Sequence, residues 1–99
     1  MGSLCSRTPN PPPYTSKAQH LQLQRAAQLR CRLAQYRRTG NAVHADTMRY
    51  ALARLLDTPV QTLPFANAAV ADAAEDALLV LNLSPGTTIS WASGRVTEI

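Results

Sequence analysis

Residues 16–38 read SKAQHLQLQRAAQLRCRLAQYRR, and this stretch predicts a long amphipathic helix over residues 17–38. Ser16 and Gln19 have the spacing of a capping box, in which the two side chains satisfy amides that a helix start leaves free. Apolar side chains recur at helical spacing on one broad face: Ala18, Leu21, Ala26, Leu29, Leu33 and Tyr36. Thr39-Gly40-Asn41 then ends the helix, because glycine readily adopts the left-handed backbone of a helix C-terminus.

Two further helices are predicted, over residues 43–56 and 67–81. The first has apolar residues at helical spacing, namely Met48, Ala51, Leu52 and Leu55. Asp57-Thr58-Pro59 ends it, because the residue before a proline avoids helical backbone angles. The second finishes in Leu78-Leu79-Val80-Leu81, which is apolar on every side. We therefore expect these four residues to be the most deeply buried segment of the chain.

The last stretch, residues 87–99, has a different composition. It is rich in Thr, Ile, Trp and Val, with Ser93-Gly94 at its middle, and this pattern indicates a short hairpin. Two strands alone are marginally stable, so the hairpin must pack on the helices or on a second copy. The predicted fold class is mainly α: a small three-helix bundle with a short C-terminal β-hairpin and a disordered N-terminal tail. Residues 1–15 form that tail, and residues 16–99 form the helical domain.

The chain begins Met1-Gly2-Ser3-Leu4-Cys5-Ser6, which fits the pattern for N-terminal myristoylation on Gly2. Cys5 is then a candidate for palmitoylation. A single myristoyl chain binds membranes reversibly, with an association constant on the order of 10⁴ M⁻¹, so stable anchoring needs a second signal. Met-Gly-Ser is also a common cloning scar, which is the alternative interpretation of this start.

A second motif, Pro11-Pro12-Pro13-Tyr14, has the form PPxY. Prolines in such a motif stack in the aromatic groove of a WW domain, and the tyrosine fills a neighbouring pocket. The partly preformed polyproline II conformation lowers the ordering cost of binding. A WW-domain protein is therefore an expected partner, and the alternative is a proline spacer before the first helix.

Positive charge is concentrated in the first half of the chain. Residues 1–45 carry seven bases and no acid, whereas residues 46–99 carry three bases and six acids. Such a distribution favours a polyanion as partner, either an anionic membrane or a nucleic acid. The candidate contact residues are Lys17, Arg25, Arg30, Arg32, Arg37 and Arg38. These bases could instead form only the solvated face of a helix. The alternative function is that of a small basic helical nucleic-acid-binding protein, such as a viral silencing suppressor or a regulator.

Catalysis, a metal site and a cofactor are not expected. His20 and His44 fall on different predicted helices, without a carboxylate and nucleophile beside them. A single domain of this size also has a small core, much of it alanine, so a homodimer is a reasonable expectation.

The acylation signal, the basic region and the PPxY tail together resemble those of small acylated viral matrix and accessory proteins. Deltaretroviral matrix proteins are similar in their Met-Gly start, a Ser-Arg pair (here Ser6-Arg7) and early prolines, although here the PPxY motif precedes the helical domain. The resemblance implies a non-enzymatic adaptor at the cytosolic face of host cell membranes that recruits ubiquitin ligases with WW domains.

Overall fold

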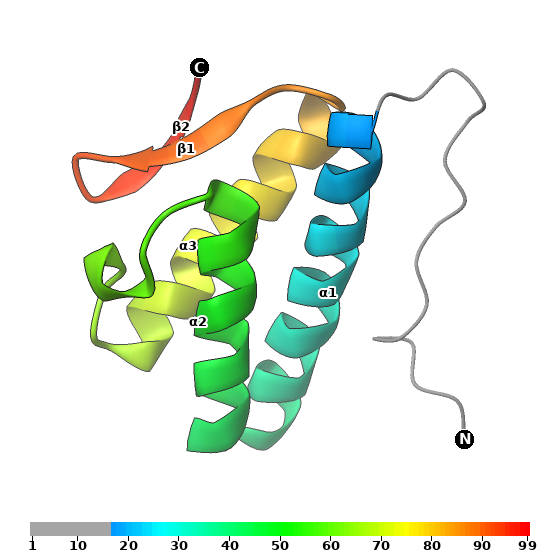
Figure 1. The fold of residues 1–99 in the computed structure, drawn as a ribbon. Coiled ribbons are helices and arrows are strands. Elements are labelled where there is room, and N and C mark those ends of the chain that lie inside the picture. Colours follow the sequence, from blue (N-terminus) through cyan, green and yellow to red (C-terminus); the bar gives the residue numbers. More distant parts are fainter. Residues whose placement is uncertain (1–16) are drawn as a thin grey trace, which may run out of the picture.

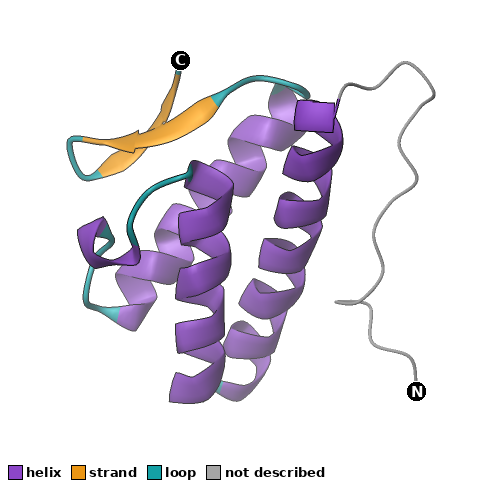
Figure 2. Ribbon diagram, in the orientation of Figure 1, coloured by secondary structure: helices purple, strands orange, loops and turns teal. Residues whose placement is uncertain are grey.

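The computed structural model describes residues 17–99 (Figures 1 and 2). Three helices follow one another along the chain: α1 (Lys17–Thr39), α2 (Ala42–Leu56) and α3 (Asn67–Leu83). A short 3-10 helix, η2 (Val60–Thr62), lies between α2 and α3, and the strands β1 (Ile89–Ala92) and β2 (Arg95–Glu98) complete the fold. The predicted three-helix bundle with a C-terminal hairpin is confirmed. The predicted tail, residues 1–15, lies outside the described residues.

The helix ends follow from local chemistry. Gly40 adopts a φ of 66° after α1, and its amide donates to the Tyr36 carbonyl at 2.7 Å. Asn41 then caps α2, because its side-chain oxygen accepts a hydrogen bond from the Val43 amide at 2.9 Å. Asp57 ends α2 in the left-handed region, with a φ of 51°. α3 extends two residues beyond the predicted end, to Leu83.

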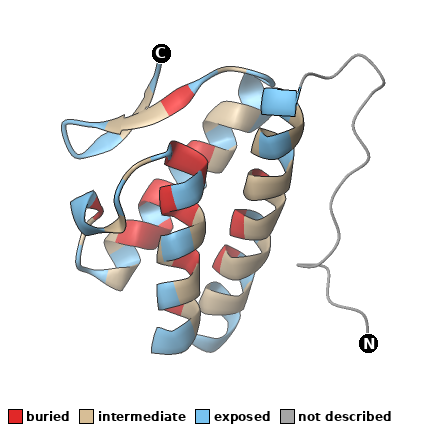
Figure 3. Ribbon diagram, viewed as in Figure 1, coloured by how far each residue is buried: buried red, intermediate tan, exposed pale blue. Residues whose placement is uncertain are grey.

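The core lies between the three helices (Figure 3). α1 contributes Ala26, Leu29 and Leu33, as its apolar spacing predicts, whereas Ala18 and Leu21 of the same predicted face are exposed. Met48 and Leu52 of α2 are fully buried. Seven of the sixteen buried apolar residues in the described part of the chain are alanines. The helices therefore pack around a core of small volume.

One expectation about burial is wrong. In Leu78-Leu79-Val80-Leu81, three residues are only partly buried, and 55% of the surface of Leu79 is exposed. The buried face of α3 lies earlier in the helix and consists of Val70, Ala71, Ala73, Ala74 and Ala77. Small side chains allow α3 to approach its neighbours closely, so the alanine-rich segment is buried. Leu78 and Leu81 pack against the edge of the core, and Leu79 is exposed.

The hairpin closes one end of the bundle. β1 and β2 pair antiparallel, and Ser93 and Gly94 form the connecting turn with φ of 55° and 75°. Ile89 is buried, and the Trp91 Nε1 donates to the Thr62 carbonyl at 3.1 Å. The hairpin thus packs on the helices of its own chain, and Figure 1 shows it beside the end of α3.

Candidate polyanion-binding surface

The proposed tail motifs precede the residues that the structure describes. Gly2 and Cys5, the candidate lipidation sites, lie outside the described residues, and so does the candidate WW ligand Pro11-Pro12-Pro13-Tyr14. Both assignments stay predictions. The structure does describe the basic first helix, which is the third feature proposed from the sequence.

All six candidate bases of the basic region belong to α1, whose sequence contains no acid. They do not share one face. Arg25 and Arg32 stand seven residues apart, which places them on the same side of a helix, and Arg30 and Arg37 form a second such pair. Arg25 of the first pair contacts α2, and Arg37 of the second pair contacts α3. The helix therefore divides its charge between two sides.

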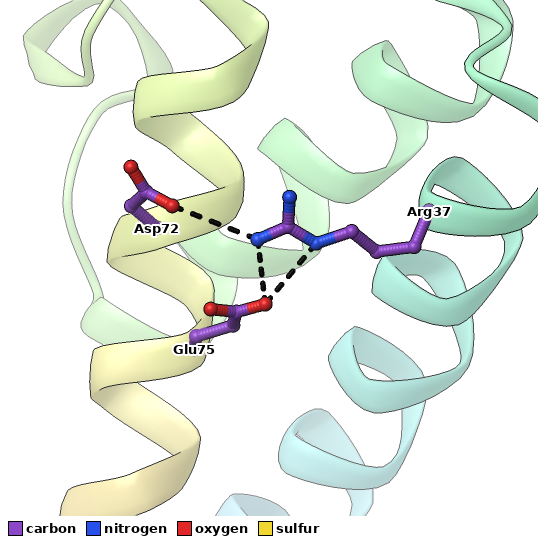
Figure 4. A network of polar contacts seen from close by, with 3 residues as sticks. All are labelled: Arg37, Asp72 and Glu75. Atoms are coloured by element: carbon purple, nitrogen blue, oxygen red, sulfur yellow. Dashed lines mark hydrogen bonds and ion pairs between the residues drawn. The ribbon is translucent and has the colours of Figure 1, made fainter.

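On the α3 side, Arg37 forms an ion pair within the protein (Figure 4). Its Nε and Nη2 both donate to Glu75 Oε1, at 3.1 and 2.5 Å, and Nη2 lies 3.6 Å from Asp72 Oδ1. The hydrogen bond to Glu75 raises the pKa of Arg37 above its ordinary value, and the charges of both acids add to the effect. Two acids offset this charge, so Arg37 is the weakest of the six as a ligand for an external anion.

On the α2 side, Arg25 lies close to a base of another helix. Its Nη1 donates to the backbone carbonyl of Arg54 at 3.0 Å. Both arginines line an open depression of about 480 Å³ at the end of α2, together with Tyr50, Ala53, Asp57, Thr58, Pro59 and Val60. Arg32 lies two turns further along the same side of α1, where its Nη1 donates to Gln35 Oε1 at 3.4 Å. We call Arg25, Arg32 and Arg54 the basic flank.

The chemistry of the basic flank suits phosphate. A guanidinium carries five N–H donors, and Arg25 uses one of its donors on the Arg54 carbonyl. The remaining donors can bind phosphate oxygens through charge-assisted hydrogen bonds. Asp57 is the one acid among the residues that line the depression, so bases outnumber acids there. The flank can therefore hold an anionic group at the surface.

The other three candidate bases remain available as well. Lys17, Arg30 and Arg38 are exposed, and the side chain of none of them makes a hydrogen bond or ion pair within residues 17–99. Arg30 also lines a groove of about 220 Å³ between α1 and the end of α3, with Leu23, Asn82 and Pro85 among its neighbours. These residues lie away from the basic flank.

Sequence reasoning missed Arg54. Nothing in the spacing along the chain links it to Arg25, which lies 29 residues earlier. Only the packing of α2 against α1 brings the two together. The same limitation applies to Arg37, because its position in α1 does not reveal that Asp72 and Glu75 of α3 lie beside it.

Residues 17–99 contain neither a cluster of metal ligands nor a membrane-spanning helix. No group of three or more His, Cys, Asp or Glu residues in this part of the chain is arranged to hold a metal ion. In the same residues, none of the helices combines the length and the hydropathy needed to cross a membrane.

Comparison of the chain with protein-family models, curated proteins and solved structures gives no significant match. The function is therefore inferred from the chain's own residues.

Proposed function

We propose that the protein is a membrane-associated, non-enzymatic adaptor of the viral matrix or accessory type. Myristate on Gly2 inserts into the cytosolic face of host cell membranes. The basic flank binds anionic lipid headgroups, and Pro11-Pro12-Pro13-Tyr14 recruits a ubiquitin ligase through its WW domain. The observation that carries the proposal is the basic flank, because it joins arginines of two helices on one side of an acid-free helix.

The energetics favour two membrane signals acting together. A single myristoyl chain gives an association constant on the order of 10⁴ M⁻¹, which is too weak for stable attachment. Each Lys or Arg near an anionic leaflet adds roughly 1 kcal/mol. Three arginines on one flank therefore raise a reversible association to a stable one. Because α1 begins at Lys17, the helix that carries two of these arginines is separated from Gly2 by only a short segment.

The first prediction tests whether vesicle binding depends on the position of the basic flank or only on the total positive charge of the protein. We expect the double variant Arg25→Gln, Arg32→Gln to bind phosphatidylserine vesicles about 30-fold more weakly, at roughly 1 kcal/mol for each base. The control variant Lys17→Gln, Arg95→Gln removes the same charge from exposed positions outside the flank and should lose much less. Co-sedimentation of the full-length acylated protein with anionic and neutral vesicles measures both effects.

Equal losses in the two double variants would contradict a role for the flank. Thermal unfolding of each variant checks that the loss of the Arg25 hydrogen bond has not unfolded the protein. The rival function, binding of RNA or DNA, predicts a gel shift that weakens steeply with salt and survives removal of residues 1–15. The adaptor function predicts that this truncation abolishes activity.

A second prediction concerns Tyr14. If Pro11-Pro12-Pro13-Tyr14 binds a WW domain, Tyr14→Ala should remove most of the affinity because the ring fills a pocket, whereas Thr15→Ala should have little effect. Phosphorylation of Tyr14 should also weaken binding, since it places about −1.5 to −2 charges in that pocket. Titration of a peptide spanning residues 8–17 against a panel of WW domains measures these effects. No binding to any domain in the panel would reduce the prolines to a spacer.

A further inference from the structure

The outer face of α3 combines acids with exposed leucines. Asp72, Asp76, Leu79 and Leu83 follow one another at spacings of four, three and four residues, so they form one continuous stripe along the helix. All four are exposed, with 55% of the surface of Leu79 and 72% of that of Leu83 accessible. Two large apolar side chains one turn apart on a solvated surface are typical of a contact site.

A matching stripe runs along the neighbouring side of α1. It consists of Leu23, Ala27, Arg30, Ala34 and Arg38, spaced three or four residues apart. This stripe contains two bases, no acid and two alanines. Alanines leave room for larger side chains of another molecule, and the bases suit a partner with acids.

The two stripes lie on helices that pack against each other. At one end of the helix pair, Leu23 and Arg30 line the same groove as Asn82 and Pro85. At the other end, Arg37 contacts Asp72 and Glu75 (Figure 4). The helices therefore run in opposite directions. The end near Leu23 and Leu83 is mainly apolar, with Arg30 as its one base, and the other end carries Arg38, Asp72 and Asp76.

We propose that this α1/α3 face binds a second copy of the chain, related by a two-fold axis that runs along the helices. That operation places α1 of each copy on α3 of the other. The end of the face near Leu23 and Leu83 then meets the same end of the second copy. Leu79 and Leu83 then pack against Ala27 and Ala34 of the second copy, and Arg38 faces Asp72 and Asp76. A two-fold axis across the helices would instead bring the bases of α1 against each other.

Two observations favour a second copy as the occupant. The face is self-complementary in charge, as an isologous interface requires, and neither Arg38 nor Asp76 makes an ion pair within residues 17–99. The core is also small, because seven of the sixteen buried apolar residues described are alanines. Burial of further apolar surface between copies stabilises domains of this kind. The basic flank, on the side of α1 that faces α2, stays outside the interface.

The proposal is tested by sedimentation equilibrium of the full chain at protein concentrations from roughly 5 to roughly 500 μM. This range detects a dimer whose Kd is micromolar. We expect a dimer for the native protein and a monomer for Leu83→Glu, since the new charge would lie in an apolar contact. Phe65→Glu is the matched control, because Phe65 is 94% exposed on the loop before α3 and outside the face. It should leave the dimer unchanged, and circular dichroism should show that both variants remain folded.

A charge exchange tests the orientation. Arg38→Asp and Asp76→Arg should each raise the dimer Kd at least tenfold, and the double variant should recover most of the loss, because opposite charges face each other again. A native protein that stays monomeric throughout the series would overturn the proposal. The proposal would also be overturned if Leu83→Glu left the dimer intact or if Phe65→Glu dissociated it. If the increases in dimer Kd from Arg38→Asp and Asp76→Arg simply added in the double variant, the proposed orientation would be wrong.

Discussion

Gly2→Ala should release the protein from membranes into the cytosolic fraction of eukaryotic cells. Alanine at this position cannot accept myristate, so the variant loses the acyl chain and with it an association constant on the order of 10⁴ M⁻¹. The basic flank alone should retain only a weak, salt-sensitive attraction to anionic lipid.

Fractionation of cells that express the native chain or Gly2→Ala measures this effect. The charge variant Arg25→Gln, Arg32→Gln provides the comparison, since it keeps the acyl chain and should be only partly released. An unchanged distribution of Gly2→Ala would remove acylation from the proposed function.

Leu52→Ala should destabilise the fold by about 2–5 kcal/mol, which is a large share of the roughly 5–15 kcal/mol that holds a typical domain together. Leu52 is fully buried in α2, in the core cluster that contains residues of all three helices. In a core with many alanines, few large side chains can move to fill the space that the substitution leaves.

Urea unfolding, followed by circular dichroism at one fixed protein concentration, measures the change. Phe65→Ala is the control, because Phe65 lies almost entirely in solvent and its truncation should change the free energy of unfolding by no more than about 0.5 kcal/mol. Similar losses in the two variants would contradict the described core.

Local signals in the sequence predict the elements of the fold well. Gly40 and Asn41 separate α1 from α2 because one supplies a left-handed residue and the other a cap. Ser93-Gly94 predicts the hairpin because Gly94 readily adopts the positive φ that the turn requires. These features depend on neighbouring residues alone, so one sequence is enough to find them.

Features that depend on packing are not predictable in this way. The apolar run Leu78-Leu79-Val80-Leu81 has the composition of a core segment. Close packing nevertheless favours the alanines before it, and Leu79 and the following Leu83 are exposed. The six bases of α1 form one group in the sequence. In the folded chain Arg37 is paired with acids of α3, while Arg25 lies beside Arg54 of α2.

Acylation of Gly2 is the step on which the proposed membrane function depends most. Intact-mass measurement of the full-length protein, isolated from the membrane fraction of eukaryotic cells, tests it directly. We predict a chain that has lost Met1 and gained the mass of a myristoyl group. A membrane-bound chain without this group, or a chain found only in the cytosol, would contradict the account.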